Sequence, residues 1–299
     1  MPGWDPETID IEVLSRGWAN KNYLVKNGDE RYVVKILTQA MGEFGLSIPR
    51  EDIMRNTELA GGAGVGARVV ARLEAPPALV LEYLHGRTLE PEDIRVPAMT
   101  ERIGRAIARL HRDTQPFEND VSAWDFINRY LELVDRHGLR TPDGLLDLLP
   151  MIGRMESALV ETAGLPVPSQ VDTYAWNLID VAGEIRIIDY DFSGMTDECF
   201  DVGDAAMEGD LDPDETARLV ESYFGGYDAT KLARVQLFGI AAQYMWSLLF
   251  TGMAQLLPEL PSDELDYWGE ASLRWEWVAK QVDRLPVGKL LEIAKGPSA

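Results

Sequence analysis

Residues 171–204 read VDTYAWNLIDVAGEIRIIDYDFSGMTDECFDVGD, and this stretch does most to decide the fold. Asp172 is followed five residues later by Asn177, and Asp189 comes twelve residues after that asparagine. Between Asn177 and Asp189, two apolar and β-branched runs flank Ala182-Gly183, which predicts a β-hairpin. The hairpin would carry Asn177 at its start and Asp189 at its end.

These polar residues suit phosphoryl transfer, which needs an acidic residue beside the attacking hydroxyl, oxygen ligands for magnesium and a cation on the phosphates. Asp172 and Asn177 have the Asp-x4-Asn spacing of a kinase catalytic loop. Asp189 follows two isoleucines, and a carboxylate at the end of a buried strand is costly unless it is paired or bound to a metal. Taken alone, Asp189 is better explained as a turn residue; together with the other two, it favours a metal site.

Upstream of this stretch, the chain reads as short strands separated by turns. The clearest apolar or β-branched runs are at 31–37 and 78–84, with another strand at 68–72. Residues 50–60 have helical character and are followed by three glycines, at 61, 62 and 64, which end the helix. The pattern predicts a small antiparallel sheet with one helix packed on it.

After Gly86 the sequence changes to long helical periods, interrupted only by the hairpin region. The expected helices are at 99–111, 123–137, 145–163, 213–224, 231–257 and 263–282. The predicted fold class is therefore α+β, with a smaller N-terminal part at 1–85 and a larger, mainly helical C-terminal part at 86–299.

Composition narrows the classes of partner. The chain has 299 residues, 28 Lys plus Arg and 50 Asp plus Glu, so its formal net charge is -22. Such an excess of negative charge argues against a nucleic-acid partner, and it suits either plain solubility or attraction of cations. The N-terminus is acidic and no run of about 18 apolar residues occurs, so we expect no membrane insertion and a cytoplasmic protein. The single cysteine, Cys199, excludes an internal disulfide.

The whole stretch quoted above resembles the choline and ethanolamine kinase family, a branch of the aminoglycoside phosphotransferase-like superfamily. The resemblance implies a two-lobed, protein-kinase-like fold that uses ATP and Mg²⁺. It also implies that Asp172 is the catalytic base and that Asn177 and Asp189 hold the metal. Asp191 matches an acidic position of the family next to metal and substrate.

The resemblance extends into the first part of the chain. Residues 17–23, GWANKNY, resemble the turn that covers the phosphates and include Asn20. The resemblance makes Lys35 the cation for the α- and β-phosphates. It also makes the segment from Glu82 to Leu84 the hinge whose backbone meets adenine. Ala108 to His111 resembles the helix that follows in the family.

Two positions depart from the family pattern. Gln170 stands where the family has a histidine two residues before the catalytic aspartate, and a glutamine can still hydrogen-bond the loop backbone. Ile53 stands where a helix glutamate would pair with Lys35. The open substitutes for that glutamate are Glu51, Asp52 and Glu58.

The resemblance also implies an acceptor pocket lined by acidic residues and aromatic rings. The candidates besides Asp191 are Trp176, Tyr244, Trp246 and Trp268, each of which has core packing as its simpler explanation. Tyr244 and Trp246 point to different faces of one helix, so we expect only one to enter the pocket. A quaternary ammonium binds best on aromatic faces, at about 0.5 to 2 kcal/mol per ring.

Three functions are consistent with these residues. The first is a kinase that phosphorylates a small cationic, hydroxylated substrate such as choline, ethanolamine or a related amino alcohol. The second is a phosphotransferase acting on an aminoglycoside or another antibiotic. The third is a nucleotide-binding pseudokinase, suggested by Gln170 and Ile53 but opposed by the retained Asp172, Asn177 and Lys35. The sequence leaves the oligomeric state open.

Overall fold

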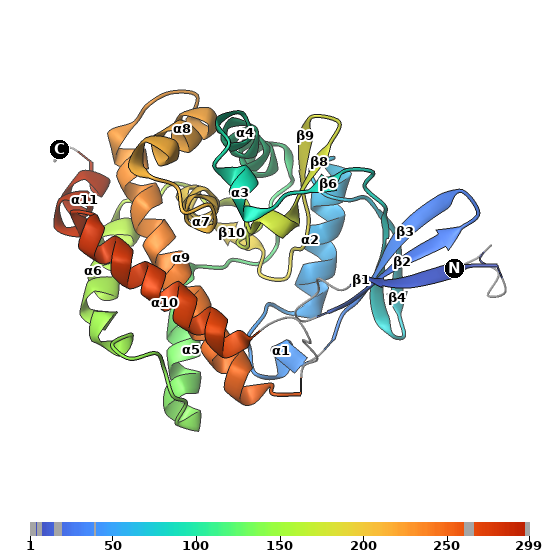
Figure 1. The fold of residues 1–299 in the computed structure, drawn as a ribbon, viewed down its shortest axis with the longest axis horizontal. Helices are drawn as coiled ribbons and strands as arrows, with labels where there is room; N and C mark the ends of the chain where they lie inside the picture. Colours follow the sequence, from blue (N-terminus) through green and yellow to red (C-terminus); the bar gives the residue numbers. More distant parts are fainter. Residues whose placement is uncertain (1–3, 5–7, 15–19, 39, 260–265, 297–299) are drawn as a thin grey trace.

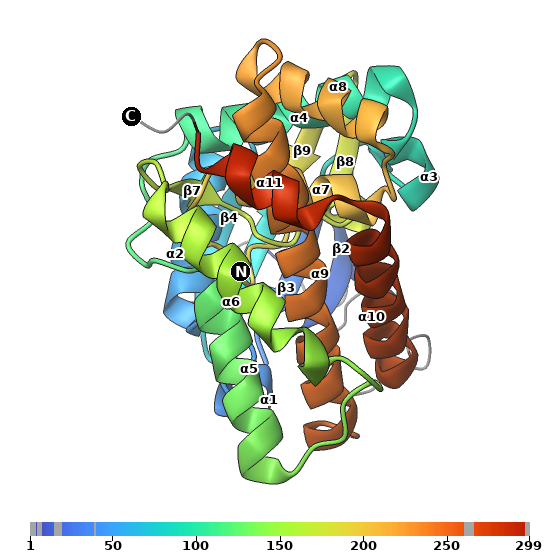
Figure 2. The same ribbon diagram turned by 90° about the vertical axis from the view of Figure 1, so that its left-hand side faces the viewer.

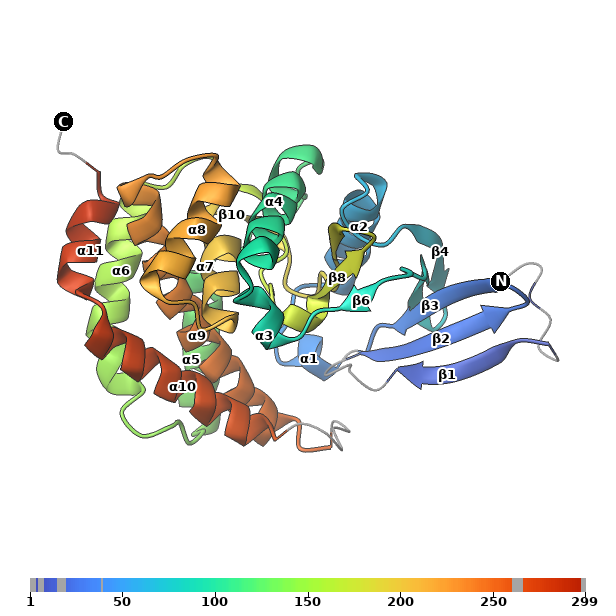
Figure 3. The same cartoon turned by 45° about the horizontal axis from the view of Figure 1, so that its top comes forward.

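The computed structural model describes residues 4, 8–14, 20–38, 40–259 and 266–296. The N-terminal part is built on a five-stranded antiparallel sheet, which extends to one side in Figure 3. Its spatial order is β1 (Asp10–Leu14), β2 (Lys21–Asn27), β3 (Glu30–Ile36), β5 (Pro77–Glu82) and β4 (Val69–Glu74). The expected small antiparallel sheet is confirmed, and two strands before residue 30 extend it.

Two helices accompany this sheet. They are α1 (Ala40–Glu43) and α2 (Arg50–Gly62). The second is the helix expected at 50–60; it runs through the first two glycines, and the chain turns away at Gly64, whose φ of 70° suits a residue without Cβ. Its inner face buries Ile53 and Met54.

The C-terminal part is mainly helical, as expected, and forms the larger portion of the molecule in Figure 1. Its α-helices are α3 (Pro91–Ile94), α4 (Pro97–Asp113), α5 (Ala123–His137), α6 (Leu149–Glu161), α7 (Cys199–Glu208), α8 (Pro213–Phe224), α9 (Ala229–Leu256), α10 (Tyr267–Arg284) and α11 (Val287–Ala294). Two 3-10 turns, η1 (Leu146–Leu148) and η2 (Ala175–Asn177), precede α6 and the hairpin. The helix expected at 145–163 is therefore a short turn followed by α6.

Helix α9 is the centre of this part. It contacts α5, α7, α10 and α11 and lies among them in Figure 2. By length and composition alone α9 could cross a membrane, but 94% of its apolar window is buried inside the fold, as in the core helix of a globular protein. The surrounding helices, rather than lipid, cover its apolar surface.

The expected hairpin is present and lies between the two parts. Its strands β8 (Leu178–Val181) and β9 (Glu184–Ile187) pair antiparallel, and β6 (Arg87–Thr88) joins them in the order β6-β8-β9. Strand β9 ends three residues before the expected Tyr190, because Asp189 has a φ of 65° and leaves the extended conformation. A further pair, β7 (Val167–Ser169) and β10 (Gly194–Thr196), brackets the segment that carries the polar residues.

Candidate active site

The loop that carries Asp172 is held from behind by buried carboxylates of α7. The Asp201 carboxylate accepts hydrogen bonds from the backbone N–H groups of Gln170 and Val171, at 2.9 and 3.0 Å. Val171 has a φ of 75°, a conformation that a β-branched residue adopts only when its surroundings impose it. The loop is therefore fixed by α7, an element that the sequence patterns did not predict.

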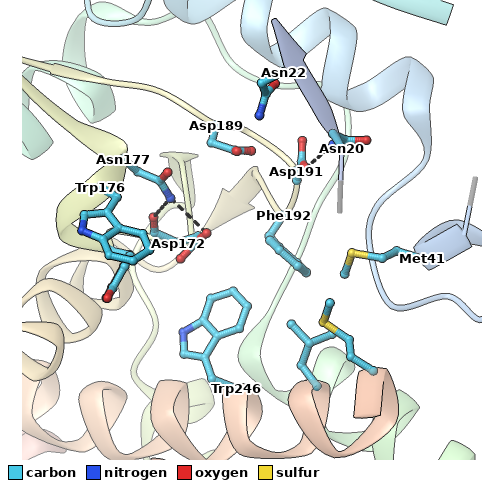
Figure 4. Close-up of a pocket in the computed structure, with 13 residues that line it drawn as sticks. Asn20, Asn22, Met41, Asp172, Trp176, Asn177, Asp189, Asp191, Phe192 and Trp246 are labelled. Carbon is cyan, nitrogen blue, oxygen red and sulfur yellow. Dashed lines mark hydrogen bonds between the residues drawn. The ribbon is translucent and has the colours of Figure 1, made fainter. Parts of the chain in front are cut away.

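The three residues singled out by spacing lie together along one pocket, as Figure 4 shows. The amide Nδ2 of Asn177 donates to the backbone oxygen and to the Oδ2 of Asp172, at 2.9 and 3.0 Å. These bonds fix the asparagine and leave its Oδ1 for another partner. Asp189 lies beside Asn177 on the same side of the pocket, at the end of the hairpin segment.

The donor chemistry of Asn177 and Asp189 fits Mg²⁺. Magnesium prefers oxygen ligands and takes only one or two protein groups when phosphates and waters complete its shell. Across the described parts of the chain, no cluster of three or more His, Cys, Asp or Glu side chains could hold a metal by itself. The site thus suits an ion that arrives together with a phosphate ligand and does not resemble a cage made only of protein groups.

Gln170 keeps the loop in contact with the hairpin, as its amide chemistry led us to expect. Its Nε2 donates to the backbone oxygens of Ile188 and Asp189, at 3.1 and 2.7 Å. One side chain thereby ties the residue that precedes the catalytic loop to the residue proposed as a metal ligand. The Gln170 Oε1, which is also buried, has no hydrogen-bond partner among the described residues.

Lys35 makes its ion pairs with the segment after β9. Its ammonium lies 2.7 Å from Asp189 Oδ1 and 2.6 Å from Asp191 Oδ1, and only 8% of the side chain is exposed. Burial opposes the charge, but the two carboxylates outweigh it and raise the pKa of Lys35. The lysine is therefore a fixed cation at the pocket wall.

Helix α2 does not supply the partner of Lys35. Glu51 instead pairs with Arg72, and Asp52 lines a different cavity, on the side of α5. Ile53 is buried in the core. Glu58 makes no ion pair with Lys35 either, so none of the three substitutes left open on α2 pairs with this lysine.

Asn20 and Asp191 lie side by side above the pocket. The Nδ2 of Asn20 donates to Asp191 Oδ2 at 2.6 Å, and its Oδ1 accepts the backbone N–H of Thr38 at 2.9 Å. The glycine-containing turn that precedes Asn20, at 17–19, falls outside the described residues. Both polar ends of Asn20 are therefore used within the protein.

A second cavity, of about 370 Å³, adjoins Lys35 on the other side of Trp176. It is lined by the apolar side chains of Val33, Leu81 and Ile179 and by the segment that includes Glu82 and Leu84. The Glu82 carboxylate accepts the backbone N–H of Arg68 at 2.9 Å and lies 3.6 Å from its guanidinium. Its apolar walls and its lysine at one end match the needs of a nucleotide base and its phosphates.

The first pocket has a polar side and an apolar side. The polar side carries Asn20, Asn22, Asp172, Asn177, Asp189 and Asp191; the apolar side carries Met41, Phe192, Trp246, Leu249 and Met253. The rings of Phe192 and Trp246 meet at 87° with centroids 4.9 Å apart. The Trp246 Nε1–H donates to Asp204 Oδ1 at 2.9 Å, which fixes the plane of the indole.

Only two of the four aromatic candidates line the first pocket. Trp246 and Trp176 line the first pocket, whereas Tyr244 does not: its hydroxyl donates to the backbone oxygen of Leu145 within the core. Trp268 is also outside the lining and packs against the guanidinium of Arg140, 4.7 Å from its ring centroid. These two candidates are corrected, because helical spacing alone does not tell which face of α9 or α10 meets the pocket.

Several lining residues were missed by sequence reasoning. They are Asn22, Met41, Tyr174, Phe192, Leu249 and Met253. Asn22 could have been found, since it stands opposite Lys35 in the β2–β3 register. The two methionines and the leucine carry no signal that distinguishes them from other core residues.

Electrostatics mark Asp172 as an unusual carboxylate. Burial raises the pKa of Asp172 well above its ordinary range, and the neighbouring Asp204 and Asp189 add to the rise, while Arg274 opposes it. Burial, with the charge of Glu208 next, raises the pKa of Tyr174 to about 12. Strongly perturbed carboxylates in a cleft are typical of residues that exchange protons.

Comparisons with known proteins place this chain in a family. The family model described as "Phosphotransferase enzyme family" matches residues 10–238. Mouse ethanolamine kinase 1 is 21% identical over 335 residues, which cover 97% of this chain and 89% of that protein.

Two solved structures show the same fold. A choline/ethanolamine kinase family protein from Mesorhizobium loti superposes with a TM-score of 0.82 at 23% identity, covering 96% of this chain and 93% of the other. The choline kinase LicA of Streptococcus pneumoniae, in its complex with AMP, superposes with a TM-score of 0.71 at 18% identity, covering 93% and 94%.

Proposed function

Because this chain belongs to the phosphotransferase enzyme family, we propose that it transfers the γ-phosphate of ATP to the hydroxyl of a small amino alcohol such as choline or ethanolamine. The observation that carries the proposal is the meeting of Asp172, Asn177 and Asp189 in one pocket that adjoins the lysine-ended cavity. The AMP complex of LicA and the kinases among the relatives support a nucleotide as the donor.

In the proposed reaction, the side chains act by position and charge. Asp172 accepts the proton of the acceptor hydroxyl as the oxygen attacks, and Asn177 fixes the orientation of this carboxylate. Lys35 neutralises charge on the donor phosphates. Asn177 and Asp189 would hold Mg²⁺, which supplies positive charge against the phosphate oxygens. No covalent intermediate on the protein is needed.

The apolar side of the first pocket suits an acceptor whose amine, at the end opposite the hydroxyl, is an alkylated ammonium. Trp246 and Phe192 offer ring surface, while Asp172 and Asp191 give the opposite wall a negative charge. A quaternary ammonium has no N–H to donate and is attracted by ring faces and by carboxylates. We therefore propose choline, or another N-alkylated amino alcohol, ahead of ethanolamine.

A panel of acceptors tests the proposal. ADP release would be measured with choline, N,N-dimethylethanolamine, ethanolamine and an aminoglycoside, each with MgATP. We expect turnover with the amino alcohols and the highest kcat/KM for choline. Turnover confined to the aminoglycoside would overturn the acceptor, and ATP binding without turnover on any of them would favour a pseudokinase.

Asp172→Asn tests the catalytic base. The amide cannot accept the hydroxyl proton, so we expect kcat to fall by about 10²- to 10⁴-fold while MgATP affinity stays within about twofold. Asp113→Asn, at the exposed end of α4, is the matched control and should keep full activity. Retained turnover in Asp172→Asn would rule out this mechanism.

A further inference from the structure

We infer that Asp191, held in place by Asn20, is the positioning residue for Lys35 and takes the place of a carboxylate on α2. The inference rests on the nucleotide-binding half of the proposed function and assigns roles that differ from those the sequence resemblance implied. There, Asp191 was a substrate-side residue and Asn20 a nucleotide-binding one.

The two carboxylate oxygens of Asp191 have different partners. Oδ1 lies 2.6 Å from the Lys35 ammonium, and Oδ2 accepts the 2.6 Å hydrogen bond from Asn20. Both oxygens are engaged by the protein, and only 11% of the side chain is exposed. Such a carboxylate is placed to hold a cation in position.

The Asp189 carboxylate is more exposed than that of Asp191. Its side chain is 32% exposed, against 11% for Asp191, and its ion pair with Lys35 is made through Oδ1. This carboxylate reaches the pocket beside Asn177. Both aspartates thus contact Lys35, and the more exposed Asp189 also lies beside Asn177 at the proposed metal position.

Asp191 is itself held in place by hydrogen bonds to two other segments. Asn20, at the start of β2, bonds Asp191 on one side and the backbone N–H of Thr38, just after β3, on the other. The backbone oxygen of Asp191 also accepts the N–H of Ile48. The carboxylate therefore links the lysine strand to the segment after β9, so that one three-residue segment sets the positions of both the cation and the metal ligand.

The structure has space beside this cluster for a carboxylate from α2. A cavity of about 280 Å³ lies beside this cluster and is lined by Ile53 as well as by Asn20, Thr38 and Asp191. A side chain at position 53 can therefore reach toward the same region. In this chain that residue is apolar, and the charge comes from position 191.

Removing the Asp191 charge should loosen Lys35 and leave it to Asp189 alone. With a single partner, the lysine is drawn toward the metal position, where it competes with Mg²⁺. For Asp191→Asn we expect the dissociation constant for MgATP to rise by about tenfold or more and the Mg²⁺ requirement to rise with it. The KM for the acceptor is not used as the readout, because Asp191 also gives one wall of the acceptor pocket its negative charge.

A rescue separates positioning from a direct role in metal binding. In the Asp191→Asn background, Ile53→Glu would return a carboxylate from α2, and we expect it to recover most of the lost MgATP affinity. Ile53→Gln in the same background is the neutral control of the same shape and should recover none. A direct metal ligand at position 191 could not be replaced from α2.

The measurements are MgATP binding by titration calorimetry and steady-state kinetics, with thermal unfolding of each variant to confirm folding. Asn20→Ala should change MgATP affinity in the same direction as Asp191→Asn. Glu51→Gln, which removes the α2 carboxylate bound to Arg72, should change it little. Unchanged MgATP affinity in Asp191→Asn, or equal recovery with Ile53→Glu and Ile53→Gln, would overturn the inference. Because binding is measured without acceptor, the result does not depend on which amino alcohol is phosphorylated.

Discussion

Asp172 must lose a proton to act as a base, and its surroundings make that loss difficult. Burial is the largest cause of its raised pKa, and the nearby aspartates add to it. A base with a raised pKa is protonated, and hence inactive, over a wider acidic range. We therefore expect kcat/KM for the acceptor to fall on the acid side of neutrality, at a pH well above the ordinary aspartate range.

The measurement is a pH profile of kcat/KM between pH 5 and 9 at saturating MgATP. Activity should decline as pH is lowered, with a slope that corresponds to one proton. A profile that stays flat down to pH 5 would show that Asp172 ionises as an ordinary aspartate does.

Gln170 offers a second prediction at the scale of one residue. Gln170→Met removes both amide hydrogen bonds to the hairpin and leaves two carbonyl groups without these donors. We expect a loss of about 1 to 3 kcal/mol in the free energy of unfolding, measured by urea denaturation. Gln255→Met is the exposed control: its amide donates to two backbone oxygens and accepts one backbone N–H, so the substitution removes three hydrogen bonds that water can replace. An equal loss in both variants would contradict a special role for Gln170.

The polar site residues could be predicted from the sequence because their spacing carries information. Asp172, Asn177 and Asp189 lie on one loop and one hairpin, so local geometry brings them together. The aromatic wall could not be predicted in the same way. Every residue of α9 from Ala233 to Met253 is buried, so the helix shows no polar face from which to choose between Tyr244 and Trp246.

The partner of Lys35 could not be predicted from the sequence, for a different reason. Counting along α2 finds Ile53 where a carboxylate is expected, but it says nothing about a carboxylate 156 positions further along the chain. Only the folded arrangement, in which Asn20 orients Asp191, shows how the lysine is held.

Helix α7 is an element that the sequence did not predict. It is ten residues long, contains Gly203 and carries Asp201 and Asp204 on its inner face, so its composition gives little sign of a buried helix. The glycine has a packing reason. A Cβ at Gly203 would lie 2.6 Å from the Val235 oxygen and 2.8 Å from the Gly239 nitrogen, so α7 and α9 approach at a residue without a side chain.

Gly203→Ala should therefore destabilise the protein. Overpacking of a close helix contact costs about 1 to 3 kcal/mol, and because α7 holds the catalytic loop, activity should fall as well. Gly153→Ala is the matched control in α6, where an added Cβ meets nothing within 4 Å. It should stabilise by about 0.5 to 1 kcal/mol. Thermal or urea unfolding of both variants measures the difference, and similar changes in the two would contradict a tight α7–α9 contact.

At the scale of the whole molecule, the net charge of -22 should act on the two substrates in opposite ways. A cationic acceptor is attracted by the negative field, whereas MgATP, which is anionic, is repelled. Added salt screens both effects, with a Debye length of about 8 Å at 0.15 M. We expect kcat/KM to fall for choline and to rise for MgATP as sodium chloride is increased.

Steady-state kinetics at low and moderate salt measure these two responses. Changes of about two- to fivefold in opposite directions are expected. Changes in the same direction for both substrates would show that the overall charge serves solubility alone.

The short strand β6 has a consequence for how the cleft can open. Gly86 sits so close to the hairpin that a Cβ there would lie 2.5 Å from the Asp180 oxygen, and the next two residues pair with β8. The connection between the two parts is thus anchored to the hairpin that leads to Asn177 and Asp189 (Figure 3). A swing of the sheet would therefore pivot at residues 83–85, ahead of this anchor, while Gly86, Arg87 and Thr88 would stay with the hairpin.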